Sequence, residues 1–363
     1  MTEKKRAKRR IEIVDVAKCF AIFMVILGHT ATNDELLGNP PVLIKVLYSI
    51  HMPLFFFLSG MSISLKPLKG RDEWIFFLRK TVLTIAIPYL LWALIYCSFN
   101  FGNLGWILYG SWSALGKTGT VTSLWYLSCL FVARFLVQGV IQAVSWKGRK
   151  GRREEYLIPM AVCLVVGALL PDIDIGYPWC VNVAFVAAGF IMMGMALKHV
   201  MIGIAVQKGW VLIACLAACV GLYTLMAVLQ GEGFGVMMMC KGAYGHPLFA
   251  LGYALLGGFA VGLLAMLAKR LADEWLSRLN LKPLIYLGQH TMGVFLLHKP
   301  MLQSLFLPFF KNLLGGGADI LVRLLATVLS LFVSLWLCRL IEYYIPELVG
   351  IFSRDIISGR NKA

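Results

Sequence analysis

The apolar residues of the chain come in blocks of about twenty, the length that a helix needs to cross the hydrocarbon core of a bilayer. Of its 363 residues, 60% are hydrophobic and 14% are charged, whereas soluble globular proteins are nearer half apolar and a quarter charged. This composition excludes an ordinary soluble enzyme, a disordered protein and a secreted disulfide-bonded domain. It predicts an all-α, polytopic transmembrane helical bundle.

The apolar segments predict ten membrane spans. They are expected at residues 14–33, 42–65, 75–99, 122–145, 156–170, 180–197, 210–229, 248–268, 284–308 and 319–341. The first span contains Asp15, Lys18 and His29 and no small-residue cleavage site follows it, so we expect a retained helix and not a signal peptide. Pro88 is expected to kink the third span. The domain prediction is a basic cytoplasmic segment at 1–13, a ten-helix membrane domain at 14–341 and a short cytoplasmic tail at 342–363.

The formal net charge of +16 comes from 34 Lys and Arg against 18 Asp and Glu. Such a balance can indicate nucleic-acid binding, but most of these cations lie in short loops that the ten spans place on one side. Lys and Arg in short loops mark the cytoplasmic side of membrane proteins. We therefore expect both termini in the cytoplasm, a multi-pass protein of the cell (plasma) membrane, the lipid bilayer as a partner, and no nucleic acid.

The nine cysteines do not form the pattern of a disulfide framework, since most lie inside apolar spans, where a thiol behaves as a small hydrophobic group. Cys180 and Cys240 are expected near loops on the same outer side, which leaves a disulfide between them open. No His, Cys or carboxylate spacing is typical of a zinc site, so no metal is expected.

Three ionisable residues in the first span are the main functional signal. Ionisable groups inside a membrane are costly and often mark function. Lys18 and His29 are eleven residues apart, which returns them to one helix face about 16 Å apart along the axis, and Asp15 lies one turn before Lys18. There are structural alternatives. Asp15 and Lys18 could extend to the cytoplasmic interface, and His29 could lie in the outer headgroup region. A shared face favours a polar stripe toward the bundle interior.

Two further spans carry polar residues. The second contains His51 and, deeper, the pair Ser59 and Gly60, where a backbone can approach a ligand closely. The ninth contains His290 and His298, two turns apart and near one face. Trp125, in the fourth span, can stack on a sugar ring, although interfacial aromatic residues occur in any membrane protein.

Together, these segments resemble the motifs of the integral-membrane acyltransferase 3 family, and within it the fucose 4-O-acetylase-like branch. The resemblance is carried by residues 15–18 continuing to 25–29, and by residues 51–60, 124–127 and 288–298. It covers the whole membrane domain, including the ten-helix count, and its first two motifs are the more specific.

The resemblance implies transfer of an acyl group, usually acetyl, from cytoplasmic acetyl-CoA to a hydroxyl of a cell-surface glycan or glycolipid. It implies an acyl-CoA donor and no bound cofactor. His29 would be catalytic, with Lys18 at the position where the family often has Arg and Asp15 beside it. Arg79 and Lys80 match a basic cluster near the CoA phosphates, whereas Thr84 stands where a further basic residue is expected. Ser59 and Gly60 are assigned to the donor, and His51, Trp125 and His298 to the acceptor.

The implied chemistry suits these residue types. A neutral imidazole can take the proton of a sugar hydroxyl as its oxygen attacks the thioester, and His29 would be that base. Lys18 or a helix N-terminus could hold the donor or stabilise charge on the thioester oxygen. A route in which His29 is acylated first stays open.

Two other functions stay open. The main alternative is a transporter or flippase of a lipid-linked saccharide, because intramembrane charges also mark proton coupling. A membrane scaffold without catalysis is a third reading, but it leaves the stripe of Asp15, Lys18 and His29 unexplained.

Overall fold

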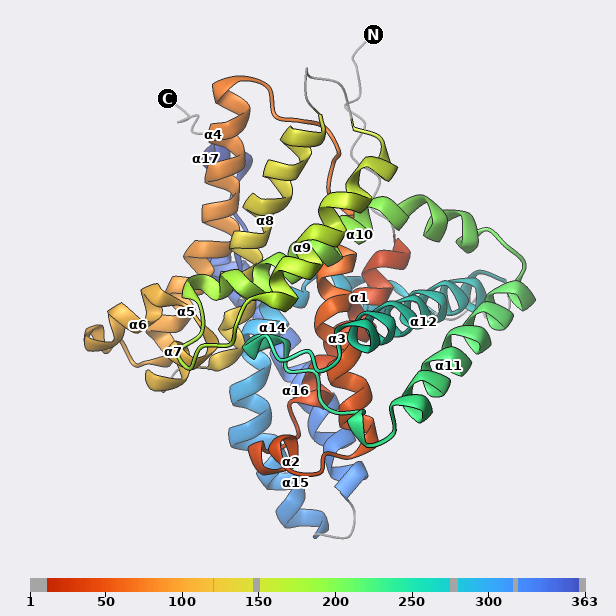
Figure 1. The fold of residues 1–363 in the computed structure, drawn as a ribbon. Helices are drawn as coiled ribbons and strands as arrows, with labels where there is room; N and C mark the ends of the chain where they lie inside the picture. Colours follow the sequence, from red (N-terminus) through yellow and green to blue (C-terminus); the bar gives the residue numbers. More distant parts are fainter. Residues whose placement is uncertain (1–11, 120, 146–150, 275–279, 316–318, 359–363) are drawn as a thin grey trace.

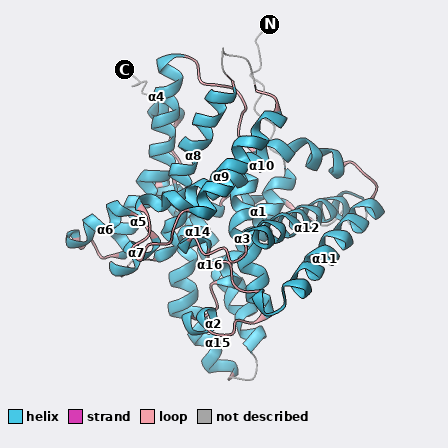
Figure 2. Cartoon of the chain, in the orientation of Figure 1, coloured by secondary structure: helices cyan, strands magenta, loops and turns pink. Residues whose placement is uncertain are grey.

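The computed structural model describes residues 12–119, 121–145, 151–274, 280–315 and 319–358, and within them it contains helices and no β-strand (Figure 2). The α-helices are α1 (Glu12–Gly28), α2 (Asn33–Leu37), α3 (Val42–Met61), α4 (Gly70–Thr81), α5 (Ile87–Tyr96), α6 (Leu104–Tyr109), α7 (Trp112–Lys117), α8 (Trp125–Val144), α9 (Leu157–Leu169), α10 (Val181–Ala205), α11 (Gly209–Gln230), α12 (Pro247–Glu274), α13 (Lys282–Gln289), α14 (Thr291–Pro300), α15 (Leu307–Leu314), α16 (Asp319–Tyr344) and α17 (Arg354–Ser358). Two π-helical stretches are Val82–Ala86 and Met301–Phe306. Short 3₁₀ turns are Phe101–Asn103, Thr122–Leu124, Arg153–Tyr156, Pro178–Cys180, Gly231–Gly233, Met239–Lys241 and Pro346–Val349. The predicted all-α class is confirmed.

Seven helices in the described part of the chain are long and apolar enough to cross a membrane. They correspond to the second, third, fourth, sixth, seventh, eighth and tenth predicted spans. The other three predicted spans are shorter or divided: α1 has 17 residues, α9 has 13, and the ninth is split into α13 and α14 at His290. The protein is therefore a multi-helix membrane protein, and the count of ten membrane spans stays a prediction.

Helix α3 lies between α1 and α10 at the centre of the bundle (Figure 1). Helix α10 packs against α3, α8 and α9, and α1 packs against α3, α12, α13, α14 and α16. In contrast, α11 packs mainly on α12 and buries only Leu212, although its sequence is as apolar as that of α10. A helix that is apolar on all sides and buries one face only presents the remainder to lipid.

Helices α3 and α10 touch through glycines. A Cβ on Gly60 would lie 1.9 Å from the Ile191 carbonyl oxygen, and one on Gly194 would lie 1.9 Å from that of Phe57. Small residues allow helix backbones in membranes to approach this closely. Gly60 therefore has a packing role.

The predicted disturbance at Pro88 takes the form of a π-helical stretch. Residues Val82–Ala86 form wider turns and lead without a break into α5, which begins at Ile87 with Pro88 as its second residue. The other π-helical stretch, Met301–Phe306, directly follows Pro300 at the end of α14.

The bundle has two distinct ends. Helices α4 and α17 pack against each other at one end, and α2 and α15 lie at the opposite end (Figure 1). The end with α4 and α17 is here called the inner end and the other the outer end. The side of the membrane that each faces remains a prediction. The basic segment at 1–11, residues 146–150 of the basic loop and residues 359–363 of the tail lie outside the described residues.

Cys180 and Cys240 are both free thiols, so the disulfide that the sequence left possible between them does not form.

Candidate functional site

His29 lies in the turn that ends α1, at the outer end of the bundle. Its amide donates to the Val25 carbonyl at 3.0 Å, whereas the Thr30 amide donates to the Leu27 carbonyl at 3.2 Å, so the helix closes with a tighter turn. The Thr30 hydroxyl donates to the same Leu27 carbonyl at 2.7 Å. His29 itself is half-buried. The turn therefore presents an imidazole at a defined position instead of continuing the helix.

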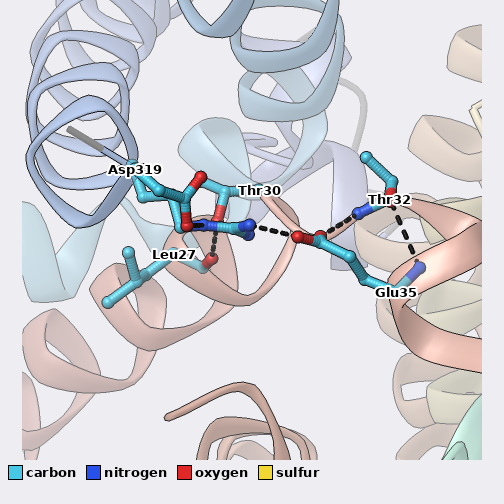
Figure 3. A network of polar contacts seen from close by, with 6 residues as sticks. Leu27, Thr30, Thr32, Glu35 and Asp319 are labelled. Carbon is cyan, nitrogen blue, oxygen red and sulfur yellow. Dashed lines mark hydrogen bonds and ion pairs between the residues drawn. The ribbon is translucent and has the colours of Figure 1, made fainter. Parts of the chain in front are cut away.

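A buried arginine from α16 fixes this turn (Figure 3). Arg323 donates to the Thr30 hydroxyl at 3.3 Å and to an Asp319 carboxylate oxygen at 2.7 Å, and it forms an ion pair with Glu35. Glu35 and Thr32 form a capping box on α2, with the Thr32 amide 2.8 Å from the Glu35 carboxylate. Arg323 thus joins α16, the His29 turn and α2.

The electrostatics of Glu35 reflect this network. Burial raises the pKa of Glu35, but hydrogen bonds from Arg323 and the Thr32 backbone, together with the Arg323 charge, hold its pKa below the usual value. Glu35 is therefore a carboxylate at neutral pH, as the ion pair requires.

Three histidines converge beside the turn. The rings of His29 and His298 stack with centroids 5.3 Å apart and planes 29° apart. His298 is fully buried, its Nδ1 lies 2.7 Å from the Phe295 carbonyl, and its Nε2 has no hydrogen-bond partner. His51 is buried, with Nδ1 against the Leu47 carbonyl and its ring edge-on to Tyr48. Among the described residues, no three His, Cys, Asp or Glu side chains are grouped as metal ligands.

His29 and His51 line a cavity of about 390 Å³, large enough for a small ligand. Its wall comes from the turn after α1, from α2, α3, α7, α8 and α14, from the 3₁₀ turn before α8, from the π-helical stretch after α14 and from the segment before α12. The remaining lining residues are Ala31, Thr32, Leu36, Tyr48, Met52, Trp112, Gly116, Thr122, Ser123, Trp125, Met237, Met238, Met239, Cys240, Phe295, Lys299 and Gln303. Thr32, Gly116 and Gln303 are exposed and form its rim. His298 lies behind His29 and is not part of this lining.

Two side chains of this cavity were not singled out from the sequence. Lys299 donates to the Thr122 hydroxyl at 2.8 Å, and Gln303 donates to the His29 backbone carbonyl at 3.2 Å. Lys299 lies inside the predicted ninth span, and Arg323 lies inside the tenth. The rule that drew attention to Asp15 and Lys18, that ionisable residues in spans are functional, applies equally to both.

Asp15 and Lys18 lie toward the inner end of α1 and not beside His29. Asp15 is buried and accepts a hydrogen bond from the Gln289 amide at 3.2 Å. A Cβ on Gly288 would lie 1.8 Å from the Asp15 carbonyl oxygen, so α13 packs directly on α1 here. Lys18 is half-buried. The interior-facing stripe is present, since Ile22 and Val25 between them are also buried, but its two polar ends are about 16–21 Å apart along the helix.

The residues assigned to the donor are more dispersed. Arg79 and Lys80 are exposed in the last turn of α4, at the inner end. Ser59 donates its hydroxyl to the Phe55 carbonyl at 2.8 Å, and Gly60 packs on α10. Neither Ser59 nor Gly60 lines the His29 cavity. The structure thus brings together His29, His51, Trp125 and His298, and separates them from the other six predicted site residues.

Comparison with known proteins supplies the family. No curated protein and no solved structure matches the chain. A family model described as an acyltransferase domain matches residues 11–340, which is nearly the whole sequence. The match covers every helix that contributes to the His29 cavity. The chain therefore belongs to the acyltransferase 3 family and is a membrane acyltransferase.

Proposed function

We propose that the protein transfers an acetyl group from cytoplasmic acetyl-CoA to a hydroxyl of a glycan or glycolipid at the outer face of the cell membrane. One observation carries the proposal: the half-buried His29 lines a cavity of about 390 Å³ at the outer end of the bundle, whereas the exposed Arg79 and Lys80 lie at the inner end. A donor with anionic phosphates and a distant thioester matches this separation of a basic surface from a reactive imidazole.

His29 is proposed as the general base. As the acceptor oxygen attacks the thioester carbonyl carbon, the hydroxyl proton passes to the imidazole, the carbon–sulfur bond breaks, and the proton then goes to the departing CoA thiolate. Stacking on His298 and the Arg323 network limit the positions that the His29 ring can take. Such positioning lowers the entropic part of the barrier.

The distances along the helices suggest how the donor is placed. Tyr96 donates its hydroxyl to the Leu296 carbonyl, which sets the end of α5 level with the region of His298. Arg79 precedes Tyr96 by seventeen residues, or about 25 Å of helix. We therefore propose that Arg79 and Lys80 attract the CoA phosphates and that the thioester reaches toward His29. Lys18, about 16 Å from His29 along α1, is placed to hold the donor but not to stabilise charge on the reacting carbonyl oxygen.

The acceptor is proposed to enter at the rim formed by Thr32, Gly116 and Gln303. Trp112 and Trp125 line the cavity behind it and offer flat apolar surfaces to a sugar ring, and His51 offers a polar contact. Two indoles beside imidazoles suit a pyranoside hydroxyl better than a long apolar acceptor.

One observation favours the transporter as the second candidate. The ninth predicted span is broken at His290 between α13 and α14, and discontinuous helices are common at transporter binding sites. Transport of a lipid-linked saccharide predicts a response to a proton gradient. Acyl transfer predicts release of free CoA without one.

The experiment uses the full chain in proteoliposomes with acetyl-CoA and a panel of pyranoside and lipid-linked sugar acceptors. Released CoA is followed with a thiol reagent and the acetylated product by mass spectrometry, with no ion gradient. The matched variants are His29→Ala and His246→Ala, since His246 is an exposed histidine outside the cavity. Acceptor-dependent CoA release that is lost only in His29→Ala supports the proposal. Gradient-driven sugar movement without CoA release would instead support transport.

A further inference from the structure

The His29 cavity contains an amino group that no motif assigns. Lys299 directly follows the buried His298 at the end of α14, and its side chain lines the same cavity as His29. Its Nζ donates to the Thr122 hydroxyl at 2.8 Å. His29 and Lys299 therefore both face this cavity. The cavity therefore presents a cation next to the candidate base.

The surroundings of Lys299 differ from those of Arg323 and Lys269. Arg323 is paired with Glu35 and Asp319, and Lys269 is paired with Glu12 and Asp273. Within the described ranges, Lys299 has a neutral hydroxyl as its hydrogen-bond partner and no carboxylate within ion-pair distance. An ammonium group without a counter-charge inside a membrane protein is costly. A substrate group that becomes negative only during the reaction would give this ammonium group a function and so a reason to be retained.

We infer that Lys299 stabilises the negative charge that develops on the thioester carbonyl oxygen during acyl transfer. This inference rests on the proposed function. When the acceptor oxygen bonds to the carbonyl carbon, the carbon–oxygen π electrons move onto the carbonyl oxygen, and the ammonium holds that oxyanion. The electrons return as the carbon–sulfur bond breaks, and CoA leaves as a thiolate that takes the proton held by His29. Lys299 keeps its own protons throughout.

The geometry separates the two tasks. Lys299 comes from α14 and is directed by Thr122, which precedes α8, whereas His29 comes from the end of α1. An imidazole and an ammonium from different helices can therefore face one substrate from two directions. A fixed donor aimed at the developing oxyanion needs no reorganisation during the reaction, which is why such groups contribute strongly to rates.

Thr122 is a positioning residue for this cation. Its hydroxyl accepts from Nζ and brings no charge that competes with the substrate oxygen. Thr122 also lines the cavity, in the 3₁₀ turn Thr122–Leu124. Removal of the Thr122 hydroxyl is expected to leave the Lys299 ammonium in the cavity but to fix its position less firmly.

The experiment measures steady-state acyl transfer by the full chain in proteoliposomes for Lys299→Met, Lys299→Arg and Thr122→Val. Lys299→Met keeps the length and removes the charge, and it is expected to lower kcat by roughly 10²–10³-fold with little change in either KM. Lys299→Arg is expected to recover part of that loss. Thr122→Val removes one hydrogen bond and is expected to lower kcat about fivefold. The control is Lys311→Met, which removes an exposed cation on α15 at the same end.

Each outcome decides the inference. An unchanged kcat in Lys299→Met, or a loss confined to KM for the acceptor, overturns it, and the second result assigns Lys299 to binding of an anionic acceptor. If Lys299→Met does not fold, as judged by its thermal midpoint, a normal kcat in folded Thr122→Val overturns the inference. The proposed function fails separately, if the wild-type protein releases no CoA. If the wild type is active, His29→Ala is inactive and Lys299→Met is fully active, only the role of Lys299 is contradicted.

Discussion

The two ends of α1 show opposite uses of polar residues. At the inner end, Asp15 is covered by α13 and hydrogen-bonded by Gln289, where the backbones touch at Gly288. At the outer end, His29 borders an open cavity, where Arg323 is paired with Glu35 and Asp319 and Lys299 has the neutral Thr122 hydroxyl as its partner. The first arrangement holds helices together, and the second leaves reactive groups facing a ligand. Ionisable residues on one helix therefore divide into structural and reactive ones according to what covers them.

The largest expected effect tests this division directly. His29→Ala is predicted to lower kcat by about 10²–10⁴-fold while the rise in thermal midpoint with acetyl-CoA persists, because a lost base slows chemistry and not donor binding. Lys18→Met is predicted to do the reverse, with weaker donor binding and near-normal kcat at saturating donor. Kinetics and thermal shift measured on both variants check this. Equal losses of kcat in the two would contradict a functional separation along α1.

The inner end is predicted to fail by packing. Gly288→Ala places a methyl group against the Asp15 carbonyl, and overpacking of this kind costs about 1–3 kcal/mol. The matched control is Gly139→Ala on α8, where a Cβ meets nothing within 4 Å. We expect a lower thermal midpoint for Gly288→Ala only. Similar midpoints for both would show that α13 can move away from α1.

The Arg323 network is predicted to connect stability with catalysis. Arg323→Met removes the cation that joins Thr30, Glu35 and Asp319, which costs about 2 kcal/mol for charged hydrogen bonds and loosens the His29 turn. Both the thermal midpoint and kcat should fall. A control change at the exposed Arg71 on α4, Arg71→Met, should affect neither. A normal kcat in Arg323→Met would mean that the turn does not need this support.

The basic inner surface is predicted to have a smaller effect. The paired change Arg79→Ala/Lys80→Ala should weaken acetyl-CoA binding by about tenfold at low salt, since each surface cation contributes about 1 kcal/mol or less to attraction of phosphates. Titration of the thermal shift at two salt concentrations checks this. Binding that is unchanged at low salt would place the CoA phosphates elsewhere.

The smallest expected effect concerns pH. Because the folded-state pKa of Glu35 is lowered, its contribution to stability is complete above the unfolded pKa of about 4.3 and is lost as pH falls through the folded value. The difference in thermal midpoint between wild type and Glu35→Gln should therefore become smaller as the pH falls from the unfolded pKa through the folded pKa. Thermal midpoints measured from neutral to acidic pH test this. A difference that grows in acid would contradict the ion pair with Arg323.

Local sequence pattern predicted the helices well but not their contacts. The apolar blocks of about twenty residues located α3, α10 and α16 because each is long and continuous. They did not show that the ninth span breaks at His290, where α13 ends and α14 begins. The contacts of Gly60 with Ile191 and of Gly288 with Asp15 join distant parts of the sequence, which no local pattern encodes.

The candidate site was predictable in part for the same reason. His29, His51, Trp125 and His298 lie in recognisable motifs, and the fold brings them to one place. Helical spacing put Lys18 and His29 on one face but could not decide which other helices cover each end. The role proposed for Lys299 depends on its hydrogen bond to Thr122, in the turn before α8, and on the cavity that it shares with His29, in the turn after α1.

The most direct test is the transfer of labelled acetyl groups across sealed proteoliposomes. Labelled acetyl-CoA is supplied on the side that protease accessibility identifies with the α4 and α17 end, and a membrane-impermeant pyranoside acceptor is enclosed on the other side. From the role of His29 as the base we expect labelled ester on the enclosed sugar with the wild-type protein and His246→Ala, and none with His29→Ala. Label reaching the enclosed acceptor at the wild-type rate with His29→Ala would contradict it.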